Sequence, residues 1–417
     1  MDFLPFWSVE HGTGLGRAPI ALATCAGLVV VSLFTARGCS VEAGGNVLRV
    51  VPQVEAPPWK PGVHWATAPA PVPREGGPLA IPIYPAWTKK QAEELFAIGP
   101  YEMFDPLCGK LWKPNLSLPQ NFPEYEGGRI VFATNSLSMR EDGEVRSKQP
   151  LLRILVTGDS HTDGVCNNRE SFPNLAEAEL RRRAGDEAAE RRERFDPESI
   201  DVLNAGKGTF SFFNYLGLLE RRLDLRPDVF VVTVYGGNDF EEVLWPWHDY
   251  GNDGPRPAGS APYADRIEAA RQINGRPLSQ ALVSVKLFSA YPAEQDVAVR
   301  AGAAVMEQIR DLCRERGIRL IVLYLPSWPD IEPTLPSLKL RKLLEALELT
   351  PEALAVTDRL ADRWLAKQKE LGIETIDLRP AFKASKTSAY WTADWHINLV
   401  GHRIVADELI KALCQRR

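Results

Sequence analysis

The stretch "ILVTGDSHTDGVCNNRESFP", residues Ile154 to Pro173, decides the fold of this chain. It begins as an apolar run rich in β-branched residues and then breaks at Gly158-Asp159-Ser160. β-Branched residues favour strands, whereas Gly, Asp and Ser favour turns, so the stretch predicts a buried strand that ends in a sharp turn. Whether Ser160 is a reactive hydroxyl or an ordinary turn residue depends on what the rest of the chain places beside it.

Apolar runs of strand length recur along the chain and alternate with amphipathic helical segments. The runs are Leu152–Thr157, Ile200–Leu203, Val229–Val234, Ile318–Leu325 and Ile373–Leu378. Runs that are apolar throughout predict strands covered on both faces. Alternation of strands and helices predicts a parallel sheet with right-handed crossovers, so we expect a doubly wound α/β domain over residues 151–417. Two of the helical segments stop at Gly317 and Gly372, as helix C-termini commonly do.

Composition narrows the classes of protein to which the chain can belong. Of its 417 residues, 45% are hydrophobic and 25% are charged, which is typical of a globular protein. The net charge of −5 provides no basic excess for neutralising phosphates, so no nucleic-acid partner is expected. Six cysteines are scattered without a C-x-x-C pair. The sequence therefore predicts no zinc or iron–sulfur site and no cofactor.

The N-terminal segment predicts contact with a membrane. From Pro19 to Ala36 the chain carries no charged residue, and this run is flanked by Arg17 and Arg37. Its length is at the lower edge for a helix that spans a bilayer, and it also fits the apolar region of an export signal. A buried core helix is the alternative. We expect residues 1–40 to form a single apolar helix that anchors the protein in the cell membrane, with the remainder outside the cytoplasm or exported after signal cleavage.

Two further segments precede the main domain. Residues 41–88 include a tract rich in proline, which cannot propagate a helix and favours extended geometry, so they predict a linker. Residues 89–150 predict an irregular lead-in, with short strands, that packs beside the main domain.

Polar residues follow the apolar runs at the points where strands are expected to end. Ser160 follows the first run, residues 204–209 the second and residues 236–239 the third, while Asp394 and His396 follow the fifth. In doubly wound sheets, ligands bind outside the carboxyl ends of the strands. These residues are therefore the candidates for a functional site.

The residue types in this set suit nucleophilic catalysis. A serine hydroxyl is a weak nucleophile at neutral pH and needs a base, for which histidine has a suitable pKa. A carboxylate must orient that imidazole and stabilise its charged form. A developing oxyanion needs preorganised donors, which glycine-rich backbone and the side-chain amide of Asn238 can supply.

The order Gly-Asp-Ser, Gly, Gly-x-Asn-Asp and a C-terminal Asp/His pair resembles the SGNH (GDSL-type) hydrolase superfamily over about residues 150–415. The segments "LWKPN" and "ATNSLSMR" before the first strand are similar to the lead-in of its membrane-anchored bacterial members. The resemblance implies a flavodoxin-like three-layer α/β/α fold with a mostly five-stranded parallel sheet. It also implies acyl chemistry without a metal.

The resemblance further implies a role for each matching residue. Ser160 would be the nucleophile, His396 the general base and Asp394 the residue that orients it. The oxyanion hole would consist of the Ser160 amide, an amide of Gly208 or Thr209, and the side chain of Asn238.

Two departures from the family pattern bear on these roles. The second block reads "NAGKGT", so Gly208 comes one residue early and Thr209 stands where the family usually has glycine. The carboxylate and base are spaced Asp394-Trp395-His396 instead of the usual Asp-x-x-His. The Asp-x-His spacing resembles alginate-type polysaccharide O-acetyltransferases of the same superfamily, which raises the possibility of a transferase.

Other residues near the candidate site have competing interpretations. His161 could act as the base, but the sharp turn after the first strand is expected to point it elsewhere. Residues 240–298 form an insert that we expect to overhang the active site. Its aromatic residues, together with one beside the base, are predicted to shape the substrate pocket, with packing of the insert as the alternative. They are Trp245, Trp247, Tyr250 and Trp395.

The sequence thus predicts a serine-dependent ester hydrolase, either a carbohydrate O-acetyl esterase or a general carboxylic esterase. The first alternative is an O-acetyltransferase that modifies a cell-surface polysaccharide, working beside polysaccharide-modification machinery. The second is a non-catalytic polysaccharide-binding protein on the same fold. The expected partner is an acylated small molecule or carbohydrate.

Overall fold

Five parallel strands form the central sheet, in the order β11-β10-β9-β7-β8. They are β7 (Leu152–Thr157), β8 (Ile200–Asn204), β9 (Val229–Tyr235), β10 (Arg319–Leu325) and β11 (Glu374–Asp377). Each strand differs from its predicted run by no more than one residue at either end. The first strand of the sheet lies between the second and third, which is the flavodoxin-like order. The predicted fold class is confirmed.

The structure is a computed structural model, and not every residue is described in it. It describes residues 39–44, 47–52, 87–147, 149–192, 194, 196–249, 258–274, 278–331 and 338–414. The predicted apolar helix at 19–36 and most of the predicted linker lie outside these ranges. Among the described residues, no helix has both the length and the apolar character needed to cross a bilayer.

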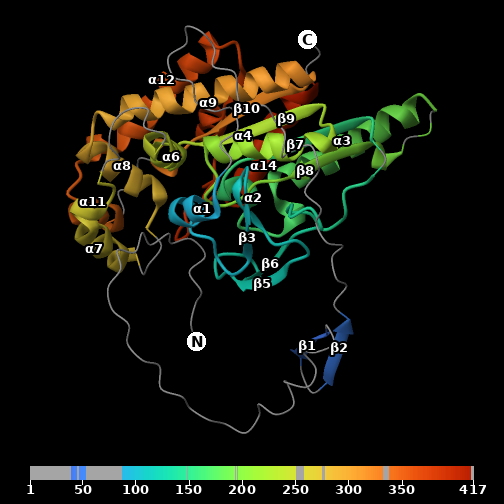
Figure 1. The fold of residues 1–417 in the computed structure, drawn as a ribbon, viewed down its shortest axis with the longest axis horizontal. Helices are drawn as coiled ribbons and strands as arrows, with labels where there is room; N and C mark the ends of the chain where they lie inside the picture. The colour runs from blue at the N-terminus through green and yellow to red at the C-terminus, as the bar shows by residue number, and fades with distance from the viewer. Residues whose placement is uncertain are drawn as a thin grey trace. The chain divides into compact units, whose positions relative to one another are not determined.

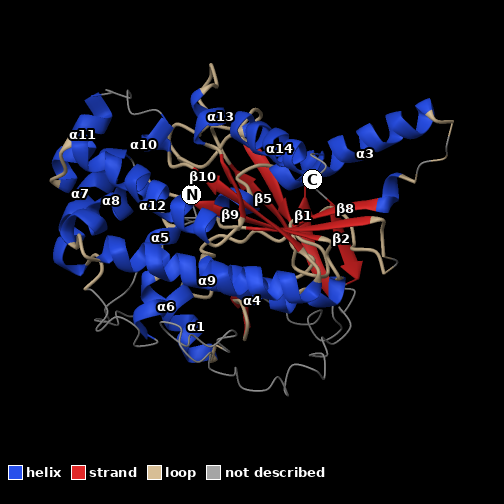
Figure 2. Ribbon diagram, turned by 90° about the horizontal axis from the view of Figure 1, so that it is seen from above, coloured by secondary structure: helices blue, strands red, loops and turns tan. Residues whose placement is uncertain are grey.

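Helices cover both faces of the sheet (Figure 1). On one face lie α3 (Phe172–Glu190) and α14 (Leu399–Cys414), which contact each other. On the other lie α4 (Phe212–Arg221), α9 (Glu294–Arg316) and α12 (Val356–Glu370), with α9 in contact with both of its neighbours. Figure 2 shows α3 and α14 on one side of the strands and α4 and α9 on the other. The left-handed residues Gly317 and Gly372 follow α9 and α12, as predicted.

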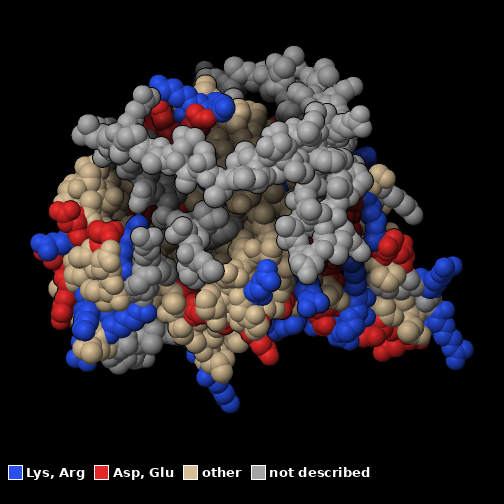
Figure 3. All heavy atoms as spheres, turned by 90° about the horizontal axis from the view of Figure 1, so that it is seen from below, with Lys and Arg blue, Asp and Glu red and all other residues tan. Residues whose placement is uncertain are grey.

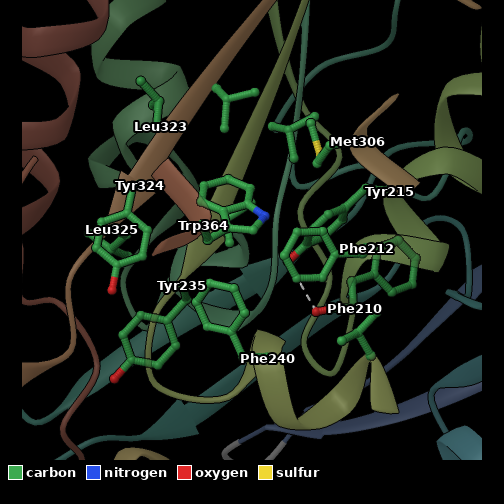
Figure 4. Close-up of a cluster of buried hydrophobic side chains, with 14 of the residues drawn as sticks. Phe210, Phe212, Tyr215, Tyr235, Phe240, Met306, Leu323, Tyr324, Leu325 and Trp364 are labelled. Atoms are coloured by element: carbon green, nitrogen blue, oxygen red, sulfur yellow. Dashed lines mark hydrogen bonds between the residues drawn. The ribbon is translucent and has the colours of Figure 1, made fainter. Parts of the chain in front are cut away.

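Burial explains why the central strands are mainly apolar. Every residue of β8 and β9 is buried, as expected for strands between two helical layers. On the α9 face, aromatic side chains fill the space between sheet and helices (Figure 4). The ring of Trp364 from α12 lies 5.8 Å from that of Phe212 and 5.9 Å from that of Phe240, measured between centroids. Phe240 directly follows the Asn238 block, so this cluster fixes one wall of the candidate site.

The open edge of the sheet at β8 is covered by acidic side chains. The Val202 N–H donates to Glu177 Oε1 at 3.1 Å, and the Asn204 N–H donates to Glu141 Oε1 at 2.6 Å. These bonds satisfy backbone donors that would otherwise template another strand. A cavity of about 340 Å³ beside this edge is lined by residues 141–146 and by α3, and it includes none of the predicted site residues.

Most of the described part of the predicted insert is helical. It contains α5 (Asp239–Glu242), α6 (Leu244–Asp249), α7 (Ala264–Asn274), α8 (Gln280–Ala290) and the start of α9. Between β10 and α14 lie α10 (Trp328–Ile331), α11 (Leu338–Leu347) and α13 (Arg379–Lys383), in addition to α12. The prediction that the insert overhangs the active site stays a prediction.

The lead-in is more regular than the sequence indicated. It contains α1 (Lys89–Phe96) and two antiparallel hairpins, β3–β4 (Glu102–Asp105 and Gly109–Trp112) and β5–β6 (Ser117–Asn121 and Arg129–Ala133). It packs on α4, where the Asn214 side chain donates to Cys108 O at 2.8 Å. A Cβ at Gly217 would lie 2.1 Å from Leu107 O, so the close approach requires glycine there.

Residues Met1–Val72 form a separate compact unit. Its described part is the antiparallel hairpin of β1 (Cys39–Gly44) and β2 (Val47–Pro52).

Charges of both signs are interspersed on the face drawn in Figure 3. On α3, Arg182 and Arg183 both pair with Glu179, at 2.8 and 2.7 Å. These arginines and Glu179 lie on a solvated face of the helix, as interleaved charges of opposite sign commonly do.

Candidate active site

Ser160 begins a short helix directly after the first strand of the sheet. The Asp159 side chain caps this helix, α2 (Ser160–Asp163), by accepting from the His161 N–H at 2.9 Å. A Cβ at Gly158 would lie 2.1 Å from Thr162 Oγ1, so the turn from β7 into α2 needs glycine. This turn places the Ser160 hydroxyl at the carboxyl end of β7, where ligands bind in such sheets.

The loop before α14 brings His396 and Asp394 to Ser160. His396 Nε2 lies 2.8 Å from Ser160 Oγ, and His396 Nδ1 lies 2.5 Å from Asp394 Oδ1. This network assigns the tautomer: Nδ1–H donates to the carboxylate, and Nε2 accepts from the serine hydroxyl. Ser160 and His396 are both buried, at 1% and 5% exposure, so the contacts are shielded from water.

Trp395, which lies between Asp394 and His396, has an unusual backbone conformation. Its φ of +73° lies in the left-handed region, which an L-residue with a Cβ rarely adopts. Asp394 Oδ1 also accepts from the His396 backbone N–H at 3.3 Å, so the carboxylate contacts both the backbone and the ring of His396. The Trp395 ring stacks on Trp328, with centroids 4.5 Å apart, and the stack supports the strained residue.

Two opposing effects set the pKa of His396. Burial is the largest single effect and lowers the pKa, but the charge and hydrogen bond of Asp394, together with the charges of Asp159 and Asp163, outweigh it. The pKa is therefore raised above its ordinary value of 6.5. An increase in pKa is expected for a base whose protonated form is stabilised by a neighbouring carboxylate.

His161 is positioned as a support for His396 and not as a second base. Its Nδ1 accepts from the Ile397 N–H at 3.2 Å, and its ring lies between those of Tyr235 and His396, at 3.8 and 4.6 Å between centroids. Burial, and then the charge of His396, hold its pKa well below the ordinary value. Because His161 stays neutral, it does not compete with His396 for a proton. The sequence identified this residue only as a competitor.

Asn238 follows the third strand, directly after a loop of two glycines. A Cβ at Gly237 would lie 2.3 Å from the Tyr235 ring, so the loop runs close against the sheet. Asn238 Nδ2 donates to Glu242 Oε1 at 2.7 Å, which leaves its second N–H available. Burial raises the pKa of Glu242 to about 8, and the charge of Asp159 adds to this effect.

In the block after the second strand, the backbone N–H groups of Gly208 and Thr209 differ in their contacts. The Gly208 N–H donates to Asp163 Oδ2 at 3.3 Å. Among the described residues, the Thr209 N–H donates to no acceptor. Thr209 has a φ of +67°, in the left-handed region, and it stands at the sequence position where the family pattern has glycine. Lys207 Nζ donates to Gly208 O at 3.1 Å, the carbonyl of the same peptide group that carries the Thr209 N–H.

Buried charged residues of the lead-in contact this block. Glu102 forms ion pairs with Lys207 and with Lys110, and the Lys207 ammonium also lies 3.7 Å from the Trp112 ring centroid. Trp112 in turn donates to Asp163 at 3.2 Å. Burial lowers the pKa of Lys110 to about 7, and the neighbouring ammonium of Lys207 adds to the effect. The lead-in therefore forms part of the site, which the sequence did not reveal.

The aromatic residues predicted to line the pocket lie in different environments. Trp247 is fully buried in the hydrophobic core, and Trp245 is half-buried against it. Trp395 is buried in its stack beside His396, and Tyr250 lies outside the described residues. The pocket role of all four stays a prediction.

Among the described residues, no group of three or more His, Cys, Asp or Glu side chains is arranged to hold a metal ion. Cys108, Cys166, Cys313 and Cys414 are free thiols.

Residues 287–417 match the model of a family described as "SGNH hydrolase-like domain, acetyltransferase AlgX". The match includes Asp394 and His396 and begins after Ser160 and Asn238. Among curated proteins, no sequence matches the chain.

Solved structures with a likeness to the chain include several esterases. The acetyl xylan esterase AlAXEase is 15% identical, with 63% of this chain and 100% of that chain covered and a TM-score of 0.34. A catalytic mutant of Axe2, an acetylxylan esterase from Geobacillus stearothermophilus, is 13% identical, with 65% and 98% covered and a TM-score of 0.35. LAE5, an alpha/beta hydrolase from the metagenome of Lake Arreo, is 14% identical, with 64% and 96% covered and a TM-score of 0.35.

Proposed function

Because this chain carries an SGNH hydrolase-like domain, we propose that it is a serine-dependent enzyme that removes the acyl group of an O-acyl ester through Ser160. Hydrolysis, as by a carbohydrate O-acetyl esterase or a general carboxylic esterase, is the reaction that the site supports without a further component. The observation that carries the proposal is the continuous contact from Ser160 Oγ through His396 to Asp394, at 2.8 and 2.5 Å.

In the first half-reaction, His396 Nε2 takes the hydroxyl proton as Ser160 Oγ attacks the ester carbonyl carbon. The tetrahedral intermediate collapses, the alcohol leaves with the proton from Nε2, and the acyl group stays on Oγ. In the second half-reaction, water gives a proton to Nε2 and attacks the acyl carbon. The second intermediate collapses, Ser160 Oγ leaves with the proton from Nε2, and the acid is released. Asp394 holds the imidazole in the required tautomer and stabilises its charged form.

The oxyanion of each intermediate would be bound by the N–H groups of Ser160 and Thr209 and by Asn238 Nδ2. Thr209 is preferred to Gly208 because the Gly208 N–H is already engaged with Asp163. The Lys207 ammonium on Gly208 O polarises the shared peptide group and fixes its direction. Such preorganised donors supply much of the catalysis in acyl transfer.

The second candidate is an O-acetyltransferase that uses the same residues but a carbohydrate hydroxyl as the acceptor. Two observations favour it: the Asp394-Trp395-His396 spacing and the match of residues 287–417 to a family described by an acetyltransferase. In that role the protein would receive its acyl group from polysaccharide-modification machinery. A non-catalytic polysaccharide-binding role is the third candidate, and the aligned Ser160 and His396 weigh against it.

Covalent labelling separates the catalytic candidates from the binding role. The full chain would be treated with a fluorophosphonate and the adduct mapped by peptide mass. Labelling of Ser160, absent in Ser160→Ala and strongly slowed in His396→Ala, is expected. A folded protein that stays unlabelled would support the binding role.

An acceptor assay separates hydrolase from transferase. p-Nitrophenyl acetate would be supplied with and without an oligosaccharide acceptor, and the fate of the acetyl group followed. Release of acetate at the same rate in both cases supports hydrolysis. Acetyl-oligosaccharide formed at the expense of acetate identifies a transferase.

The cellular location is proposed from the N-terminal sequence. Residues 19–36 carry no charge, so residues 1–40 would anchor the protein in the cell membrane with the catalytic domain outside the cytoplasm. Deletion of residues 1–40 is expected to move the protein from the membrane fraction to the soluble fraction. A full-length protein found only in the soluble fraction of the cytoplasm would contradict this proposal.

A further inference from the structure

One carboxylate of the lead-in contacts the loop that carries Asp394 and His396. Glu124, in the turn between β5 and β6, accepts from the Thr392 N–H at 2.6 Å and from the Thr392 hydroxyl at 2.7 Å. It also accepts from the N–H groups of Ala393 and Asp394, each at 3.0 Å. One carboxylate therefore accepts from the consecutive backbone N–H groups of residues 392–394. The last of these belongs to Asp394, the partner of His396.

These bonds select one conformation of the loop. Consecutive N–H groups point to the same side only in a bent backbone, and an acceptor that carries a full charge favours that bend strongly. The next residue, Trp395, has a φ of +73°, which the loop would relax if it were free. Without the carboxylate, the N–H groups of residues 392–394 would lose their shared acceptor.

Two other residues of the β5–β6 turn also contact segments that belong to the candidate site. The Phe122 ring contacts the Trp391 ring edge-on, with centroids 5.2 Å apart. On the other side, Tyr125 donates to Glu170 at 2.7 Å, in the segment that follows Ser160. The hairpin thus contacts the segment after the serine and the loop of the histidine, which lie at opposite ends of the domain sequence.

We propose that Glu124 is a positioning residue, which holds residues 392–394 so that the Asp394 carboxylate stays aligned with His396 Nδ1. This inference rests on the proposed function for its consequence in catalysis. The alignment itself is a property of the loop and can be measured without turnover. Glu124 acts through Asp394 and does not contact the reacting atoms.

The structure offers a matched pair of variants. Glu124→Gln keeps the shape of the side chain but removes the charge and one acceptor oxygen. Glu126→Gln makes the same change two residues away, where the side chain is exposed and no described contact joins it to the loop. Thr392→Val removes only the hydroxyl contact and leaves all charges unchanged, so it separates alignment from a simple loss of charge.

The first readout is the pKa of His396, followed by NMR of the imidazole in the full chain. Because Asp394 raises this pKa, a loosened Asp394 must lower it. We expect a lower value in Glu124→Gln, a smaller decrease in Thr392→Val and no change in Glu126→Gln. The proposal would be overturned if His396 kept its wild-type pKa in both Glu124→Gln and Thr392→Val while cooperative thermal unfolding showed that both variants are folded.

The second readout is turnover of p-nitrophenyl acetate. We expect kcat of Glu124→Gln to fall by about 10- to 100-fold with KM little changed, since small displacements of catalytic groups have effects of this size. A lowered melting temperature with unchanged kcat and unchanged pKa would mean that the contact is only structural. If Glu124→Gln does not fold, Thr392→Val decides the question. If the wild type shows neither turnover nor labelling, the proposed function fails while the NMR result still stands.

Discussion

His396 Nε2 lies 2.8 Å from Ser160 Oγ, although 236 positions separate the two residues in the chain. The contact follows from the topology of the sheet. β7 lies at its centre, and the loop before α14 returns to the carboxyl end of that strand. Asp394 completes the relay through its contact with His396 Nδ1. The predictions below test each part of this arrangement.

Asp394→Asn is expected to lower kcat on the order of 10⁴-fold, since an amide favours the wrong tautomer of the imidazole in such a relay. Thermal unfolding should stay cooperative, because Asp394 is only half-buried. Steady-state turnover of p-nitrophenyl acetate measures the effect. A change of only a few fold would remove Asp394 from the mechanism.

The pH dependence of kcat/KM should show an acidic limb above 6.5, the ordinary pKa of histidine. His396 must be neutral to accept the serine proton, and its pKa is raised, so activity is lost as pH falls through that raised value. In Asp394→Asn, burial is no longer opposed by this carboxylate, and the limb should move to lower pH. Asp159, whose pKa burial raises to about 7, titrates in the same range, so the limb reports both groups. A limb that does not move in Asp394→Asn would contradict this assignment.

Asn238→Ala should lower kcat by about 10²- to 10³-fold with little change in KM, as expected for loss of one oxyanion donor. Glu242→Gln is the control, since its amide oxygen can still accept from Asn238 Nδ2. That variant should stay close to wild-type activity. Equal losses in both variants would indicate that Asn238 acts through packing.

Thr209→Gly should keep most of the activity, because the backbone N–H is retained. The φ of +67° no longer carries a Cβ penalty of roughly 1–2 kcal/mol, which offsets the entropic cost of glycine. Urea unfolding is expected to show a free energy of unfolding close to that of the wild type. A large loss of stability would show that the Thr209 side chain, and not the backbone, determines this turn.

Glu102→Gln should lower the free energy of unfolding by about 3–5 kcal/mol, because it leaves the buried ammonium groups of Lys110 and Lys207 without their counter-ion. Adding Lys110→Met should recover part of the loss, since one of the two like charges is removed. A double-mutant cycle in urea measures this coupling. Additive effects would mean that the cluster is weaker than its geometry indicates.

The strands were predictable because burial on both faces leaves a continuous apolar run in the sequence, as in Val229–Tyr235. The site residues were predictable because they occupy strand ends in a fixed order. The packing of the insert could not be predicted, since its apolar residues, such as Trp247, pack into a core that no local pattern specifies.

The supporting residues could not be predicted in this way. Glu124 meets its partners 268 to 270 positions away, and the pairing of Lys207 with Glu102 joins segments 105 positions apart. Surface and buried charges look alike in a sequence, because burial depends on contacts distant along the chain. His161 was weighed only as a base, since nothing local shows that its Nδ1 accepts from Ile397.

The most direct test of the central claim is to trap the acyl-enzyme. The full chain would be mixed with p-nitrophenyl acetate, quenched in acid during steady-state turnover and digested for peptide mass mapping. An acetyl group on the peptide that contains Ser160, absent in His396→Ala under the same conditions, is the predicted result. Turnover without acetylation of Ser160, or acetylation that is equally fast without His396, would contradict the account.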